Sequence, residues 1–155
     1  MLALGASVLL LLLATLPPFV GDEARAFVMW VFAGLCHQLP DRSPHVDGVA
    51  LAVCHRCYGI YWGLPLAALA FLALQRWDAR ISRAARFLVP AAVAVPGADW
   101  LADVLGLWTN TPASRFVTGG VFGLVAGYFL ARAFVELFVP REAERAVAVG
   151  ERETE

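Results

Sequence analysis

Long apolar runs constrain this chain more than any other feature. A helix needs about 20 consecutive, mainly apolar residues to cross a hydrocarbon core. Three runs reach that length, at residues 1–20, 57–75 and 117–139. A fourth run, at 87–108, contains two prolines and two aspartates. Its first residues are too apolar for a surface loop, and the run matches a kinked spanning helix. The sequence therefore predicts an all-α integral membrane bundle of four transmembrane helices.

Composition agrees with this class. Charged residues make up 16% of the chain and apolar residues 60%, whereas soluble domains carry about 25% charged residues. The net charge of −1 gives no argument for a nucleic-acid partner. We expect a single membrane domain over residues 1–140, surrounded by membrane lipid, and a polar cytoplasmic tail over 141–155. Glycines four residues apart on two of the spans suit close helix packing within the chain or in a homo-oligomer.

The first apolar run has an alternative interpretation as a cleaved signal peptide. No Lys or Arg precedes its apolar core, and prolines and acids separate that core from the small-residue motif at 24–26. These features favour a retained membrane anchor.

Arginines indicate how the bundle is oriented. The segment 76–86, expected to be a short loop, carries four arginines against one aspartate, so the positive-inside rule places it in the cytoplasm. A second group of arginines follows the last span. Both termini are then cytoplasmic in a multi-pass protein of the cell inner membrane, and the segment between the first two spans is extracytoplasmic.

That extracytoplasmic segment divides into two parts. Residues 22–36 contain an apolar stretch too short to cross, and they predict a short helix lying at the outer interface. Residues 36–57 are rich in Pro, Asp, Ser and Gly and predict a loop. The second span would begin at the CxxC motif that ends this loop.

All cysteines and all histidines of the chain lie between residues 36 and 57. Cys54 and Cys57 have the spacing that lets two thiolates occupy adjacent corners of a tetrahedral ion. Cys36 and His37 would supply the remaining ligands, and His55 is a competing one. The sequence predicts a metal site, most simply zinc, with Cys36, His37, Cys54 and Cys57 as ligands.

Other functions remain open at this point. Cys54 and Cys57 could form a disulfide, with Cys36 as a further thiol, in a membrane thiol-disulfide oxidoreductase coupled to a quinone. The cysteines could also be inert, and a channel, carrier or assembly partner is a third class.

Two acids follow in the third predicted span. Asp99 and Asp103 are four residues apart and therefore share one helix face. They could be further metal ligands, a general base beside a metal-bound water, or structural partners of Arg56 or Arg115. In a catalytic version, Asp99, Asp103 and Arg115 would act on a lipid headgroup or phosphate-like substrate at the outer interface. Whether the chain is an enzyme stays open.

The motifs CHQxxxRS and CxRCxGIYxG, followed by an Asp in the third span and RxxTG at the start of the fourth, resemble a known family. It comprises small predicted membrane proteins of bacteria and archaea, called domain of unknown function two thousand and eighty-five. The resemblance implies a membrane location and signature positions in the cysteine segment, without an activity. The positions that it implies as signature residues are Cys36, His37, Gln38, Arg42, Ser43, Cys54, Arg56, Cys57, Gly59, Tyr61, Gly63, Asp99, Arg115, Thr118 and Gly119.

Overall fold

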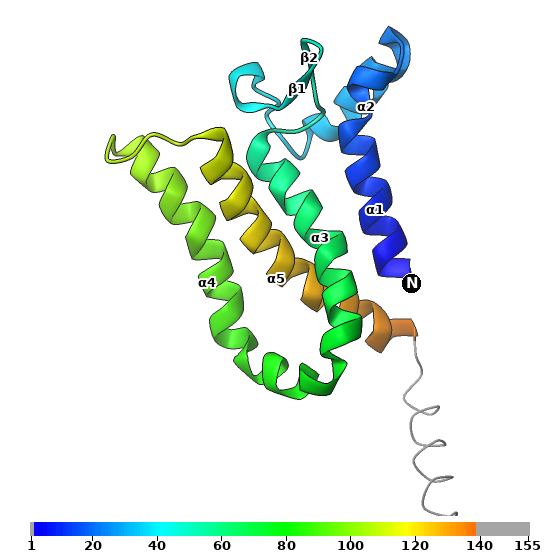
Figure 1. Cartoon of the computed structure of the whole chain (residues 1–155), viewed down its shortest axis with the longest axis vertical. Coiled ribbons are helices and arrows are strands. Elements are labelled where there is room, and N and C mark those ends of the chain that lie inside the picture. Colours follow the sequence, from blue (N-terminus) through cyan, green and yellow to red (C-terminus); the bar gives the residue numbers. More distant parts are fainter. Residues whose placement is uncertain (1, 139–155) are drawn as a thin grey trace, which may run out of the picture.

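The computed structural model describes residues 2–138, which are helical apart from loops and one short ribbon (Figure 1). The helices are α1 (Leu2–Thr15), α2 (Asp22–Ala33), α3 (His55–Leu74), α4 (Asp78–Val104) and α5 (Pro112–Phe138). Short 3-10 turns are η1 (Pro17–Phe19), η2 (Pro40–Arg42) and η3 (Gln75–Trp77). The strands β1 (His45–Val46) and β2 (Val49–Ala50) pair antiparallel. The predicted tail at 141–155 lies outside the described residues.

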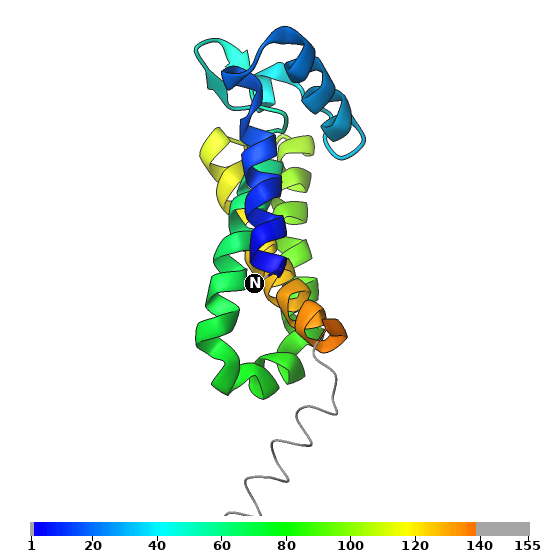
Figure 2. The same cartoon turned by 90° about the vertical axis from the view of Figure 1, so that its right-hand side faces the viewer.

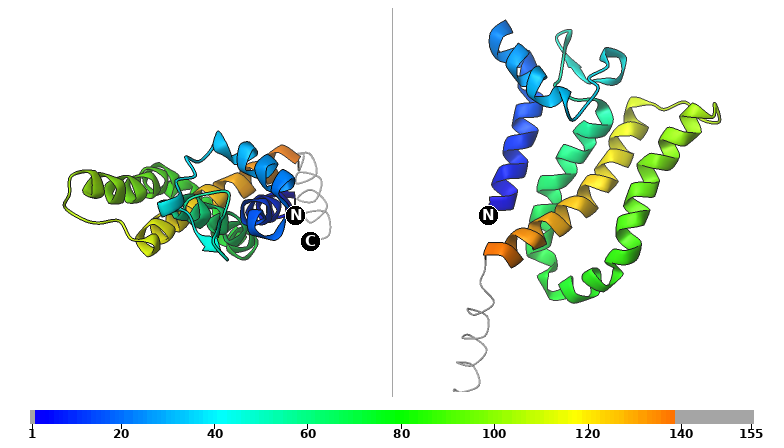
Figure 3. Two further views of the ribbon diagram at one scale, coloured as in Figure 1. Left: turned by 90° about the horizontal axis from the view of Figure 1, so that it is seen from above. Right: turned by 180° about the vertical axis from the view of Figure 1, so that it is seen from behind.

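The long helices lie side by side in a row. α5 lies between α3 and α4, and α1 packs on the other side of α3. Seen from above, this order gives a flat, elongated arrangement (Figure 3). Among the described elements, α3 and α5 make the most extensive contact.

Glycines make the α3–α5 contact close. Gly119 of α5 faces the backbone of Arg56, and Gly123 faces that of Ile60 on α3. Gly63 of α3 faces the backbone of α5 in return. A Cβ at any of these glycines would collide with the opposite backbone, so a side chain would push the helices apart. The predicted small faces therefore pack on each other within the chain, and a homo-oligomer stays a prediction.

Two helical stretches are long and apolar enough to cross a membrane, residues 55–104 and α5. The first comprises α3, η3 and α4, and it turns back on itself so that α3 and α4 run in opposite directions (Figure 1). α1 is apolar but has only 14 residues, about 21 Å of helix against a hydrocarbon core of about 30 Å. The described residues therefore do not confirm four transmembrane helices, which stay a prediction.

The segment 76–86 differs from the prediction of a loop, because η3 and the first turns of α4 make it helical. No Gly or Pro interrupts it, and α4 runs on through Pro90 and Pro96 as one helix. The start of α4 is tied to α5: the Tyr128 hydroxyl donates to the Asp78 carboxylate at 3.0 Å, and Arg132 pairs with Asp78 at 3.4 Å. A tight helical turn therefore joins α3 to α4.

The end of the bundle opposite this turn carries α2 and the ribbon (Figure 2). α2 buries Val28 and Phe32 and exposes a second apolar face, on which Trp30 is 73% exposed. An apolar face left exposed on a short helix is the pattern expected at a membrane interface. The observed bounds of α2 lie within the predicted 22–36.

Candidate metal centre

The three cysteines come from two elements that meet at this end of the bundle. Cys36 follows the last turn of α2, where its N–H donates to the Phe32 carbonyl at 2.9 Å, and it is 6% exposed. Cys54 is the residue that caps the N-terminus of α3, and Cys57 lies in the first turn of that helix. The CxxC motif thus turns both side chains toward the end of α2.

The sulfur atoms of Cys36, Cys54 and Cys57 all lie within 4.8 Å of one another. Sulfurs that share one tetrahedral zinc ion are about 3.8 Å apart, because each Zn–S bond is about 2.3 Å. The Cys54 N–H also donates to the Cys36 sulfur at 3.2 Å. The cluster is therefore close to the size that a bound ion requires.

The environment of Cys54 favours its thiolate. Hydrogen bonding with the Cys36 thiol, and next with the Cys57 thiol, lowers the pKa of Cys54 well below its usual range. The thiolate is both the metal ligand and the nucleophile of cysteine chemistry.

The histidines stand apart from the three sulfurs. His37 is exposed and lies outside the cluster, although it lines the same cavity as the cysteines. His55 directs its Nδ1 to the Arg42 carbonyl at 2.7 Å, and His45 directs its own to the Ser43 carbonyl at 2.9 Å. The structure brings three of the four predicted ligands together.

Gln38 holds the two halves of the site in place. Its Nε2 donates to the Met29 carbonyl on α2 at 2.8 Å and to the Ala52 carbonyl, just before the CxxC motif, at 2.9 Å. Its backbone is left-handed, with φ of 51°, which is uncommon for a residue with a side chain. The family resemblance marked Gln38, but no local pattern in the sequence predicted this clamp.

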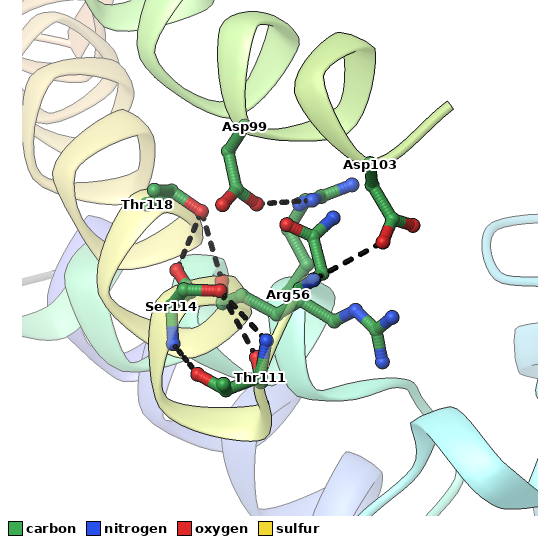
Figure 4. A network of polar contacts seen from close by, with 8 residues as sticks. Arg56, Asp99, Asp103, Thr111, Ser114 and Thr118 are labelled. Atoms are coloured by element: carbon green, nitrogen blue, oxygen red, sulfur yellow. Dashed lines mark hydrogen bonds and ion pairs between the residues drawn. The ribbon is translucent and has the colours of Figure 1, made fainter. Parts of the chain in front are cut away.

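Arg56, one of the two residues between Cys54 and Cys57, links the site to α4 and α5. Its Nη2 donates to the Asp99 carboxylate on α4 at 2.6 Å (Figure 4). The side-chain amide of Asn110 is oriented to match the donors and acceptors around it. The amide nitrogen donates to the Asp99 carboxylate at 2.8 Å, and the amide oxygen accepts from Arg56 Nη2 at 3.2 Å. Asp99 is thus a paired, hydrogen-bonded carboxylate within an interior network.

Asp103 and the start of α5 complete the network in Figure 4. The Asn110 N–H donates to the Asp103 carboxylate at 3.1 Å. Thr111 and Ser114 donate their N–H groups to each other's hydroxyls, which fixes the first turn of α5. Sequence reasoning missed Asn110, because a single Asn in a loop gives no signal of its distant partners.

A cavity of about 380 Å³ adjoins the cysteines. Arg42, Arg56 and Arg115 contribute to its wall, and Asp99 and Asp103 do not. Of the three residues predicted for catalysis, only Arg115 reaches this space. The residues lining it are Leu35, Cys36, His37, Gln38, Leu39, Arg42, Cys54, Arg56, Cys57, Ile60, Trp100 and Arg115.

Comparison with known proteins places the chain in a family. The family described as "Predicted membrane protein (DUF2085)" matches residues 36–129, so the chain belongs to it. The match begins at Cys36 and takes in the whole cysteine cluster, Asp99 and Arg115. A protein of Methanocaldococcus jannaschii, described as uncharacterised, is 28% identical over 107 residues, covering 69% of this chain and 68% of the relative. No solved structure matches. The resemblance read from the motifs is confirmed, and the chain is a predicted membrane protein.

Proposed function

We propose that this membrane protein carries a zinc ion, held by Cys36, Cys54 and Cys57, which fastens the end of α2 to the start of α3. The observation that carries the proposal is the approach of the three sulfurs to within 4.8 Å of one another. Cys36 and Cys54 are 18 residues apart in the chain, and a cross-link between such residues limits the unfolded ensemble and couples ion binding to folding.

A structural ion suits this part of the molecule. Between α2 and α3 the turn η2 and the two-residue strands β1 and β2 are the only regular secondary structure, and the rest of the segment is loop. So small a segment gains more from an ion than from its own core. We assign the fourth ligand to His37, which is adjacent to Cys36 and borders the same cavity. The side chain would turn inward when the ion binds.

In the membrane, we propose that α3, α4 and α5 cross the bilayer and that the first predicted span, which contains α1 and η1, contributes the fourth crossing. The arginine-rich turn around η3 lies at the end opposite the cysteines (Figure 1). The positive-inside rule then places the cysteine cluster on the extracytoplasmic side of the inner membrane. Both termini would be cytoplasmic.

The experiment measures metal and thiols on one sample. The protein is purified in mild detergent without reducing agent, its zinc is quantified by elemental analysis, and its free thiols are counted by alkylation before and after a chelator. We expect close to one zinc per chain and thiols that react only after chelation. Cys57→Ser should lose the metal, and His45→Ala, whose ring contacts the loop backbone, should keep it.

A metal-free protein with a Cys54–Cys57 disulfide would overturn the proposal. It would favour the thiol-disulfide oxidoreductase instead, because the same closeness of three sulfurs suits thiol exchange. Reduction of a quinone by the protein with a reduced thiol substrate would then be the direct assay.

A further inference from the structure

We propose that the cavity beside the cysteines is a binding site for a phosphate group, with Arg42 and Arg115 as its principal contacts. The cavity has a volume of about 380 Å³, within the range of about 300–1,000 Å³ typical of small-molecule sites. The site adjoins the proposed metal centre, but it depends on the arginines and stands whether or not zinc is bound.

The wall of the cavity is strongly basic. Among the described residues that line it, three are arginines and none is Asp or Glu. Asp99 offsets the charge of Arg56 from outside the cavity. A zinc ion bound by three thiolates would add one negative charge. The net charge around the cavity would still be positive, and a positive net charge attracts an anion.

Guanidinium N–H groups in the cavity wall are available to an anion. Within residues 2–138, neither Arg42 nor Arg115 forms an ion pair with an acid. Arg56 holds Asp99 through Nη2, yet its Nε is buried and has no hydrogen-bond partner among the described residues. Buried donors are normally satisfied, so an acceptor from outside the chain is expected here. The guanidinium fork matches phosphate oxygens in bidentate pairs.

The remaining wall is apolar. Leu35, Leu39, Ile60 and Trp100 border the cavity, and Trp100 is half exposed on α4. A phosphate carried on an apolar body therefore fits the space as well as a free phosphate does. In both cases the recognised chemistry is the phosphate group.

The test uses the full chain purified in detergent with its metal content measured. Binding is followed by tryptophan fluorescence, because Trp100 lines the cavity. The probes are inorganic phosphate, dioctanoyl phosphatidic acid, and dioctanoylglycerol, which lacks the phosphate. The variant combines Arg42→Gln with Arg115→Gln. The control is Arg83→Gln, which lies on α4 near the opposite end and whose only side-chain hydrogen bond within residues 2–138 goes to the Ala79 carbonyl.

We expect saturable binding of at least one phosphate probe and weaker binding by about tenfold or more for each arginine removed, as the loss of a charge-assisted hydrogen bond predicts. Arg83→Gln should bind as the parent does. Tighter binding of phosphatidic acid identifies a lipid headgroup, and tighter binding of inorganic phosphate identifies a free anion. If the Gln pair unfolds, Arg42→Lys with Arg115→Lys keeps the charge and should bind more weakly than the parent.

The proposal fails if neither phosphate probe binds, if the Gln pair binds as the parent does, or if dioctanoylglycerol binds as tightly as phosphatidic acid. The metal centre is judged separately. Zinc-free protein that still binds phosphate through the two arginines would overturn the metal centre alone. Zinc-loaded protein that binds neither probe would overturn the phosphate site alone.

Discussion

The Arg56 guanidinium donates a hydrogen bond to the Asp99 carboxylate across 2.6 Å. Arg56 lies between Cys54 and Cys57, its side chain reaches α4, and its backbone packs against Gly119 of α5. One residue therefore links the candidate metal centre to α3, α4 and α5. Of the two residues between the cysteines of the CxxC motif, Arg56 therefore has a structural role of its own.

Replacing Asp99 with Ala should destabilise the protein, because it leaves the Arg56 charge unpaired in a partly buried site. The Asp99 side chain is 9% exposed and that of Arg56 22%. Breaking one partner of a buried pair costs about 3–5 kcal/mol, and the partial exposure of Arg56 places the expected loss near the lower figure. Unfolding in detergent, followed by circular dichroism, would measure it.

Two variants control this prediction. Asp22→Ala removes a carboxylate that is 95% exposed in its pair with Arg25, so it should change stability by less than about 1 kcal/mol. Arg56→Met combined with Asp99→Leu removes both charges and should recover much of the loss. Equal stability of the Asp99→Ala and Asp22→Ala variants would show that the pair does not hold α4.

Adjacent glycines on α5 should respond oppositely to alanine. A Cβ at Gly119 would run into the Arg56 carbonyl, whereas a Cβ at Gly120 would meet its nearest atom, the Gly59 carbonyl oxygen, at an ordinary 3.7 Å. We expect Gly119→Ala to cost about 1–3 kcal/mol through overpacking. Gly120→Ala should be neutral or stabilise by up to about 1 kcal/mol, because Ala favours helix. Thermal melts of both variants in one detergent would compare them, and similar melts would argue against the close α3–α5 contact.

His37 should prove to be the fourth ligand when cobalt replaces zinc. Cobalt in a site of three thiolates and one imidazole gives absorption bands that report the ligand set and tetrahedral geometry. His37→Ala should shift these bands and weaken metal binding by about tenfold or more. His55→Ala should leave both unchanged, since His55 is directed to the Arg42 carbonyl. An unchanged spectrum for His37→Ala would show that His37 does not bind the metal.

The orientation can be tested with lysines, because the chain contains none. Arg25→Lys on α2 and Arg80→Lys on α4 conserve charge and lie at opposite ends of the bundle. A membrane-impermeant amine reagent added to spheroplasts should label Arg25→Lys above the parent. Arg80→Lys should be labelled only after the membrane is permeabilised. The reverse pattern would invert the proposed topology.

Sequence patterns that act over a few residues predicted much of the helical structure. Apolar runs located α3 and α5 within a few residues, and the short amphipathic stretch located α2. The CxxC spacing singled out Cys54 and Cys57, and Cys36 was added as the remaining thiol; all three meet. These properties depend on hydropathy, periodicity and the spacing of ligand atoms, which the local chain determines.

Tertiary packing decided the remaining features. Packing placed α5 between α3 and α4 and left His37 outside the sulfur cluster. It also brought Asp99 into an ion pair with Arg56 and a hydrogen bond with Asn110. The composition of the chain is compatible with several ways of packing the membrane helices around the cysteine cluster. Which helices approach closely depends on glycines that meet across two helices, and which acid pairs with which arginine depends on that approach. Such contacts join residues far apart in the chain, so no local pattern specifies them.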